Sequence, residues 1–179
     1  MEKADAVEQA EIKANHVVSD FKAKTNEMFN DIEGQSPEDV EQTVYAHIMA
    51  KLEEYDIPVE IVDVVVSGSR CRGLEQEGSD LDVVVEYKGR ENEDDLFNAF
   101  NEDGLMIGGV KVDINPITEG KTGTLETYLP GVESYLVEKQ KTMEQEPKSI
   151  FCVRMNNEHR YFENTSSLDE EALCKAYGE

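Results

Sequence analysis

The chain has 179 residues and a formal net charge of −23, because 40 acidic residues stand against 17 Lys and Arg residues. This length is sufficient for one substantial domain with a proper core and no need of disulfides. The charge argues against extended binding to nucleic acid, since attraction to a phosphate backbone requires many cations. An acidic surplus is typical of solvated surfaces, and it attracts divalent or basic partners.

The cysteines and the hydropathy pattern indicate the compartment. Cys71, Cys152 and Cys174 are widely spaced and form no CxxC pair and no ligand cluster with the three histidines. This usage fits a reducing compartment. No apolar run approaches the roughly 20 residues that cross a bilayer, and the N-terminus lacks the pattern of a signal peptide. We therefore expect a cytoplasmic protein without a membrane-spanning segment.

Residues 1–57 are expected to form a helical lead-in to the main domain. Apolar residues recur at helical spacing from Ala6 to Ile32, which predicts an amphipathic helix. This helix either packs on its own domain or forms a homodimer, and the sequence leaves both open. Ser36-Pro37-Glu38-Asp39 then supplies an N-cap, a proline in the first turn and an acidic N3 residue. A second helix is predicted from there to the residues before Asp56.

Residues 58–143 are expected to form the core domain, and residues 149–179 a small appendage. In the core, Gly108-Gly109 closes a hairpin, Pro116 ends its second arm, and Pro130 kinks a helix or starts a new one. The appendage contains a hairpin and a capped helix from Ser167. The order of elements predicts an α+β fold with a mixed β-sheet flanked by helices. The predicted elements are strands at 59–66, 80–87, 105–107 and 110–114, helices at 91–103 and 124–141, a linker at 144–148, and hairpin arms at 149–155 and 159–162.

The turn after the first predicted strand has the features of an anion site. Gly68 lets the backbone turn sharply and lets a ligand approach, while neighbouring hydroxyls and amides donate hydrogen bonds. Arg70 and Arg72 are the only basic residues between Leu52 and Tyr87. A phosphate would need such cations at this turn. The alternative is a turn that carries two solvated arginines.

Three carboxylates are predicted to converge near this turn. Asp80 and Asp82 share one face of a strand about 6.6 Å apart, because side chains alternate along a strand. Asp113 lies on a later strand and could reach the same end of the sheet. Three such groups repel one another unless a cation neutralises them, and hard oxygen ligands suit Mg²⁺ or Mn²⁺. Two such ions can activate an attacking oxygen and stabilise a leaving phosphate.

The combined pattern resembles a known family. Gly68-Ser69, ten further residues, Asp80-Leu81-Asp82 and then Asp113 in Val-Asp-Ile are similar to the active-site signature of the nucleotidyltransferase superfamily with the DNA polymerase β-like fold. The sequence is most similar to the minimal nucleotidyltransferases, which often act as antitoxins, and to aminoglycoside nucleotidyltransferases. The likeness covers about residues 59–117. It implies metal ligation by Asp80, Asp82 and Asp113. It also implies triphosphate binding at the turn, through Gly68 and Ser69 with help from Arg70 and Arg72.

The expected function follows from this resemblance. The chain would transfer a nucleoside monophosphate from a nucleoside triphosphate, with ATP as the expected donor, to a hydroxyl of a protein, small-molecule or RNA acceptor, and release pyrophosphate. Asp80 and Asp82 would hold the nucleotide-bound Mg²⁺, and Asp113 would complete a second metal site or accept the acceptor's proton. The alternative is a catalytically silent module that acts by contact with a partner protein. Such a module would be antitoxin-like or part of a larger mobile-element polypeptide.

Overall fold

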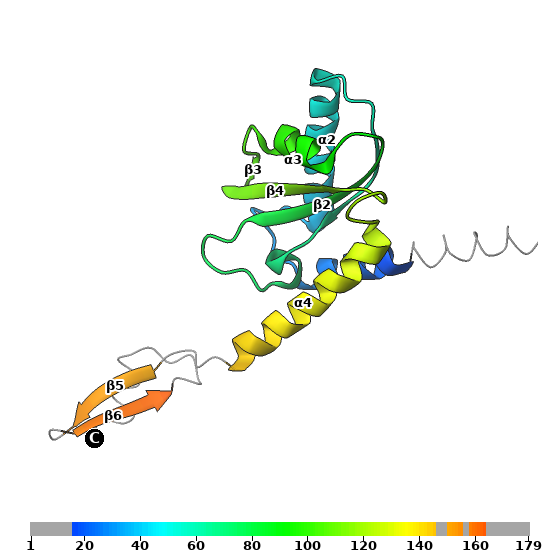
Figure 1. Cartoon of the computed structure of the whole chain (residues 1–179). Coiled ribbons are helices and arrows are strands. Elements are labelled where there is room, and N and C mark those ends of the chain that lie inside the picture. The colour runs from blue at the N-terminus through cyan, green and yellow to red at the C-terminus, as the bar shows by residue number, and fades with distance from the viewer. Residues whose placement is uncertain (1–15, 146–149, 156–157, 164–179) are drawn as a thin grey trace, which may run out of the picture. The chain divides into compact units, whose positions relative to one another are not determined.

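The computed structural model describes residues 16–145, 150–155 and 158–163 (Figure 1). The chain divides into two compact units, Met1–Val137 and Glu138–Glu179. The helices are an N-terminal helix over residues 16–28, α2 (Pro37–Glu54), the short 3₁₀ helix η1 (Ser69–Arg72), α3 (Glu93–Asn101) and α4 (Leu125–Gln145). The strands are β1 (Glu60–Val66), β2 (Leu81–Lys88), β3 (Met106–Ile107), β4 (Val110–Ile117), β5 (Ile150–Met155) and β6 (Glu158–Glu163).

The first unit contains a mixed four-stranded sheet in the order β1-β2-β4-β3. β1 pairs antiparallel with β2, β2 pairs parallel with β4, and β3 pairs antiparallel with β4. Parallel strands need a long crossover, and α3 supplies it between β2 and β4. The two-residue turn at Gly108-Gly109, where both φ angles are positive (53° and 74°), closes the β3–β4 hairpin. The prediction of an α+β fold with a mixed sheet flanked by helices is confirmed.

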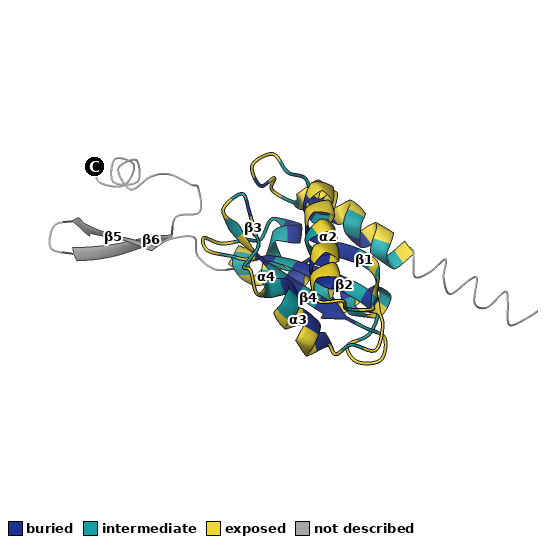
Figure 2. Cartoon of the chain, turned by 90° about the horizontal axis from the view of Figure 1, so that it is seen from above, coloured by how far each residue is buried: buried dark blue, intermediate teal, exposed yellow. Residues whose placement is uncertain are grey.

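Helices cover both faces of this sheet. α2 and α3 lie on one face, and the N-terminal helix and the first part of α4 lie on the other (Figure 1). The buried residues gather between the helices and the strands, while the outer helix faces are exposed (Figure 2). The sheet is apolar on both faces, as expected for a central strand such as β2 that is covered twice. Fully buried members of this core include Val44, Ile48, Val65, Val83, Val84, Val85, Leu96, Phe100, Ile114 and Leu129.

The start of α2 agrees with its sequence signature. Ser36 Oγ accepts a hydrogen bond from the Asp39 amide (3.2 Å), and the Asp39 carboxylate accepts one from the Ser36 amide (2.9 Å). Pro37 occupies the first turn, where its missing N–H breaks no helical bond. Such a reciprocal capping box satisfies two amides that the helix leaves free. The predicted second helix is therefore confirmed.

Several predicted boundaries differ from the structure; for example, β2 begins at Leu81 instead of Asp80, and α4 extends to Gln145 instead of residue 141. The N-terminal helix ends at residue 28 instead of Ile32, which forms an isolated bridge with Gln35. Pro116 lies inside β4 instead of ending it, and it pairs with Val85 of β2. β3 pairs with only the first two residues of β4, so among the residues that the structure describes β4 has a neighbouring strand on one side only at Pro116. A proline is tolerated there because its missing N–H interrupts no ladder on the open side.

The C-terminal predictions are tested in part. α4 continues through Pro130, so no new helix begins there. β5 and β6 pair antiparallel from Ile150↔Glu163 to Met155↔Glu158, which confirms the predicted hairpin. The helix predicted from Ser167 and most of the 144–148 linker lie outside the described residues. The predicted division of the chain into residues 1–57, 58–143 and 149–179 stays a prediction. Within the described ranges, no helix combines the length and apolarity that crossing a membrane requires.

Candidate active site

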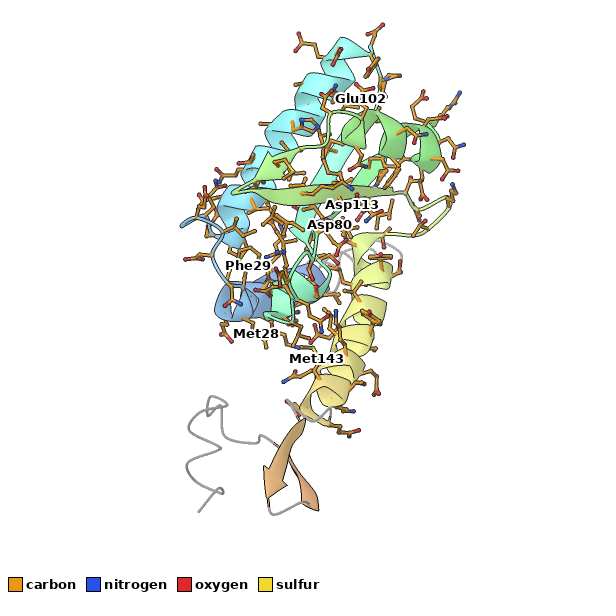
Figure 3. All side chains as sticks on the ribbon, turned by 90° about the vertical axis from the view of Figure 1, so that its left-hand side faces the viewer. Met28, Phe29, Asp80, Glu102, Asp113 and Met143 are labelled. Carbon is orange, nitrogen blue, oxygen red and sulfur yellow. The ribbon has the colours of Figure 1, made fainter. Side chains whose placement is uncertain are left out.

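The parallel pairing of β2 and β4 places two of the predicted carboxylates side by side. Asp82 is the register partner of Asp113, and Leu81 is that of Val112. Partners on adjacent strands point to the same face of a sheet, and the strands lie about 4.8 Å apart. Asp80 immediately precedes β2 and is exposed. Figure 3 shows Asp80 and Asp113 on the neighbouring loop and strand. The fold thus brings all three aspartates to one region.

The Gly68 turn lies directly against Asp82. The Ser67 amide donates to the Asp82 carbonyl oxygen (2.8 Å), which fixes the end of β1 beside β2. Gly68 has a φ of 66°. A Cβ atom at this position would lie 2.7 Å from Asp82 Cγ and closer still to Oδ2. Both the backbone conformation and the close approach of the carboxylate therefore require glycine.

The residues after Gly68 form the short helix η1. Ser69 begins η1 and is half-buried, and its carbonyl oxygen accepts from the Leu74 amide (3.0 Å). Cys71 Sγ donates to the Gly68 carbonyl oxygen (3.0 Å). Burial raises the pKa of the Cys71 thiol to about 11. Cys71 is therefore protonated at neutral pH and supports the turn, which argues against a role as a nucleophile.

Arg70 holds the loop that precedes the aspartates. Its Nε and Nη2 atoms donate to the carbonyl oxygen of Ser79 at 3.1 and 2.9 Å. Ser79 is the residue before Asp80, so this guanidinium fixes the backbone that carries the first carboxylate. Arg70 is half-buried. It lies beside the turn at which the sequence predicted that an arginine helps to bind a phosphate.

Arg72 has a different environment from Arg70, because it is a buried residue, only 6% exposed. Nη1 donates to Thr25 Oγ1 (2.8 Å) and to the Cys71 carbonyl oxygen (2.9 Å), and Nη2 donates to Glu133 Oε2 (2.6 Å). The guanidinium carbon lies 4.3 Å from the centroid of the Phe21 ring. The structure thus places Arg72 as an anchor between the N-terminal helix, η1 and α4. Both Nη atoms bind protein acceptors, which differs from the help in phosphate binding that the sequence suggested for Arg72.

The backbone beside Asp113 is fixed by a residue that sequence reasoning missed. The Asn101 side chain accepts from the Ile114 amide (2.9 Å) and donates to the Ile114 carbonyl oxygen (2.8 Å). An asparagine at the end of a helix gives no sequence signal for such a role. The Asp113 carboxylate faces Lys111, whose Nζ lies 3.5 Å from Oδ1. Lys111 and Asp113 share a face of β4, as their spacing predicts.

A cavity of about 510 Å³ opens beside Asp82. One wall is the sheet and the turn, and the other is α4, which contributes Tyr128, Gly131 and Tyr135. Burial and the negative charge of Asp82 raise the pKa of Tyr128. The volume lies within the usual range for pockets that hold small molecules and cofactors. The full lining is Ser67, Gly68, Asp82, Val84, Asn115, Thr122, Thr127, Tyr128, Gly131, Val132 and Tyr135.

A larger cavity of about 870 Å³ lies between the N-terminal helix, the sheet and the start of α4. Its lining includes Val18, Lys22, Asp63 and Glu126, but none of the three aspartates and no residue of the Gly68 turn. Lys22 is already paired with Glu41 and Asp63 there. Although this cavity is larger, the candidate active site is assigned to the cavity beside Asp82, which contains residues of the Gly68 turn.

Comparison with known proteins gives the family. A family model described as a nucleotidyltransferase domain matches residues 48–144, which include the sheet, the turn, the three aspartates and most of α4. The chain belongs to the nucleotidyltransferase domain family. No curated protein and no solved structure matches the chain. Membership supports a transferase that uses a nucleoside triphosphate and has a general role in nucleoside monophosphate transfer.

Nucleotidyltransferases of this family generally use Mg²⁺ or Mn²⁺. In residues 16–145, 150–155 and 158–163, no group of three or more His, Cys, Asp or Glu side chains is arranged to hold a metal ion. The donor set nevertheless fits such an ion. Asp82 and Asp113 are register partners, Asp80 precedes Asp82 by two residues, and all three supply hard oxygen atoms.

Proposed function

We propose that this nucleotidyltransferase domain transfers a nucleoside monophosphate, with ATP as donor, to a hydroxyl group of an acceptor. The observation that carries the proposal is the register pairing of Asp82 with Asp113 directly beside the Gly68 turn. In the reaction, the acceptor oxygen forms a bond to the α-phosphorus, and the bond from that phosphorus to the α–β bridging oxygen breaks. Pyrophosphate leaves, and the acceptor's proton goes to a base.

The binding of the triphosphate is assigned to the turn and the cavity. Gly68 permits a close approach, and Ser67 and Gly68 line the cavity directly before Ser69, so that the hydroxyls and amides of this turn would donate to a phosphate. Tyr128 and Tyr135 offer aromatic surface on the opposite wall for the nucleoside. Arg70 supports this binding by holding the loop at Ser79. This geometry favours a phosphate-bearing ligand that spans from the turn to α4.

The chemistry is assigned to the three carboxylates. Asp80, Asp82 and Asp113 would hold Mg²⁺, which when bound supplies charge neutralisation for the triphosphate and lowers the pKa of a coordinated hydroxyl. Asp113 is in addition a candidate general base, because its side chain is 32% exposed. Asn101 keeps the Asp113 backbone in place through its two hydrogen bonds to Ile114.

A catalytically silent module is the second candidate. Two observations favour it. Among the described residues, no group of three His, Cys, Asp or Glu side chains is arranged to hold a metal ion, and Asp113 is paired with Lys111. Such a module would act by contact with a partner protein, in the manner of an antitoxin. It would not need a divalent ion for that contact.

Calorimetry of the whole chain separates these candidates. Titration of the protein with ATP in Mg²⁺ is expected to give saturable binding that disappears when EDTA removes the ion. A silent module would give no metal-dependent heat. It would instead form a partner complex that survives when Asp80 and Asp82 are both replaced by Asn. Absence of metal-dependent ATP binding by the wild-type protein would contradict the enzyme proposal.

A further inference from the structure

The buried contact between Arg72 and Glu133 joins two segments that are 61 residues apart in the sequence. Arg72 closes η1, the short helix that follows the Gly68 turn, and Glu133 lies on α4. The Nη2–Oε2 distance is 2.6 Å, and the exposed fractions of the two side chains are 5% and 29%. Arg72 and Lys24 hold the pKa of Glu133 below its usual value even though burial would raise it. The pair is therefore charged at neutral pH.

One of these segments, α4, forms a wall of the cavity beside Asp82, and the Gly68 turn, which directly precedes η1, lines the cavity on another side. Gly68 lies four residues before Arg72, and its carbonyl oxygen is held by Cys71, whose own carbonyl oxygen accepts from Arg72. On the other wall, Gly131 and Val132 line the cavity directly before Glu133. A change in the distance between Arg72 and Glu133 would therefore change the width of the cavity.

Other contacts hold the Arg72 side chain in one orientation. Its planar guanidinium reaches three acceptors in different directions, on Thr25, Cys71 and Glu133, and also lies over the Phe21 ring. A lysine ammonium is a point charge on a flexible stem and cannot reproduce this fork. The contact between Arg72 and Glu133 thus fixes the orientation of the guanidinium as well as the position of its charge.

We propose that Arg72 and Glu133 form a clamp that sets the separation of the turn and α4, and thereby the affinity of the cavity for a nucleoside triphosphate. This inference rests on the proposed function. Both are positioning residues, because they act through the Gly68 turn and through the α4 wall. The clamp replaces the direct phosphate contact that the sequence suggested for Arg72.

The test compares two ligands on the full-length protein. Binding of a fluorescent N-methylanthraniloyl derivative of ATP in Mg²⁺ reports on the whole cavity, and binding of Mn²⁺ alone, followed by electron paramagnetic resonance, reports on the carboxylates. Glu133→Gln and Arg72→Lys are each expected to weaken nucleotide binding about tenfold and to leave Mn²⁺ binding unchanged. The double variant is expected to lose no more than either single variant, because both substitutions break the same contact.

Lys24→Ala is the matched control. Lys24 also pairs with Glu133 (Nζ–Oε1, 3.0 Å), but its side chain is more than half exposed. This variant is expected to bind the nucleotide like the wild type. Equal nucleotide affinity in Glu133→Gln, Arg72→Lys and the wild type would overturn the clamp alone. A parallel loss of nucleotide and Mn²⁺ binding would also overturn it, since that result indicates general misfolding of the site. No nucleotide binding by the wild type would overturn the proposed function and the clamp together.

Discussion

Asp82→Asn is expected to abolish metal-dependent nucleotide binding while the protein stays folded. Asp82 is the one carboxylate that touches both halves of the candidate site, because it is the register partner of Asp113 and lies against Gly68. Asn keeps the shape of the side chain but removes the charge that a divalent ion requires. We expect the affinity for Mg²⁺·ATP to fall at least about a hundredfold, since even the loss of a residue that only hydrogen-bonds a metal ligand costs about 10–100-fold. Calorimetry under the conditions used for the wild type measures this loss.

Asp95→Asn serves as the control for the change in net charge. Asp95 lies in the first turn of α3 and is exposed, on the side of the sheet away from α4. Its affinity for Mg²⁺·ATP is expected to equal that of the wild type. An Asp82→Asn protein that binds the nucleotide as tightly as Asp95→Asn would contradict the role that we assign to Asp82.

Gly68→Ala is expected to have the largest effect on stability among single substitutions in the turn. A non-glycine residue at φ 66° costs about 1–2 kcal/mol, and relief of the overlap between the new methyl group and the Asp82 side chain adds about 1–3 kcal/mol. We therefore expect the free energy of unfolding to fall by about 2–5 kcal/mol. Urea denaturation followed by circular dichroism measures it.

Gly120→Ala is the matched control for this substitution. Gly120 lies between β4 and α4, its φ is not positive, and a Cβ atom there would meet nothing within 4 Å. The free energy of unfolding of this variant should match that of the wild type within about 0.5 kcal/mol. If Gly68→Ala were as stable as Gly120→Ala, the close approach of Asp82 to the turn would not be a feature of the folded protein.

Local patterns in the sequence were sufficient to predict the turn and the carboxylates. The spacing of Gly68, Asp80 and Asp82 predicts a turn followed by a strand that begins at Asp80, and in the structure this strand begins one residue later, at Leu81. The convergence of Asp113 depended on a parallel pairing of two strands about 30 residues apart. The sequence predicted only that Asp113 could reach the same end of the sheet, and the structure shows the parallel register that places it beside Asp82.

Long-range contacts explain what the sequence could not predict. Whether an arginine is solvated or buried depends on its neighbours, and those of Arg72 include Thr25 and Glu133, 47 and 61 residues away. Asn101 gave no signal because its role depends on where Ile114 lies in space. Pro116 was misjudged because β3 is short and leaves one side of β4 unpaired at this residue in the described structure. The sequence around Pro116 does not predict the length of β3.

Transfer of a labelled phosphate is the measurement that tests the central claim most directly. The full-length protein would be incubated in Mg²⁺ with cell lysate and with ATP labelled at either the α- or the γ-phosphorus. Nucleotidyl transfer predicts a labelled acceptor only from α-labelled ATP, labelled pyrophosphate from γ-labelled ATP, and neither product with Asp82→Asn. An acceptor labelled from γ-labelled ATP, or no labelled acceptor and no pyrophosphate from the wild-type protein, would contradict the account.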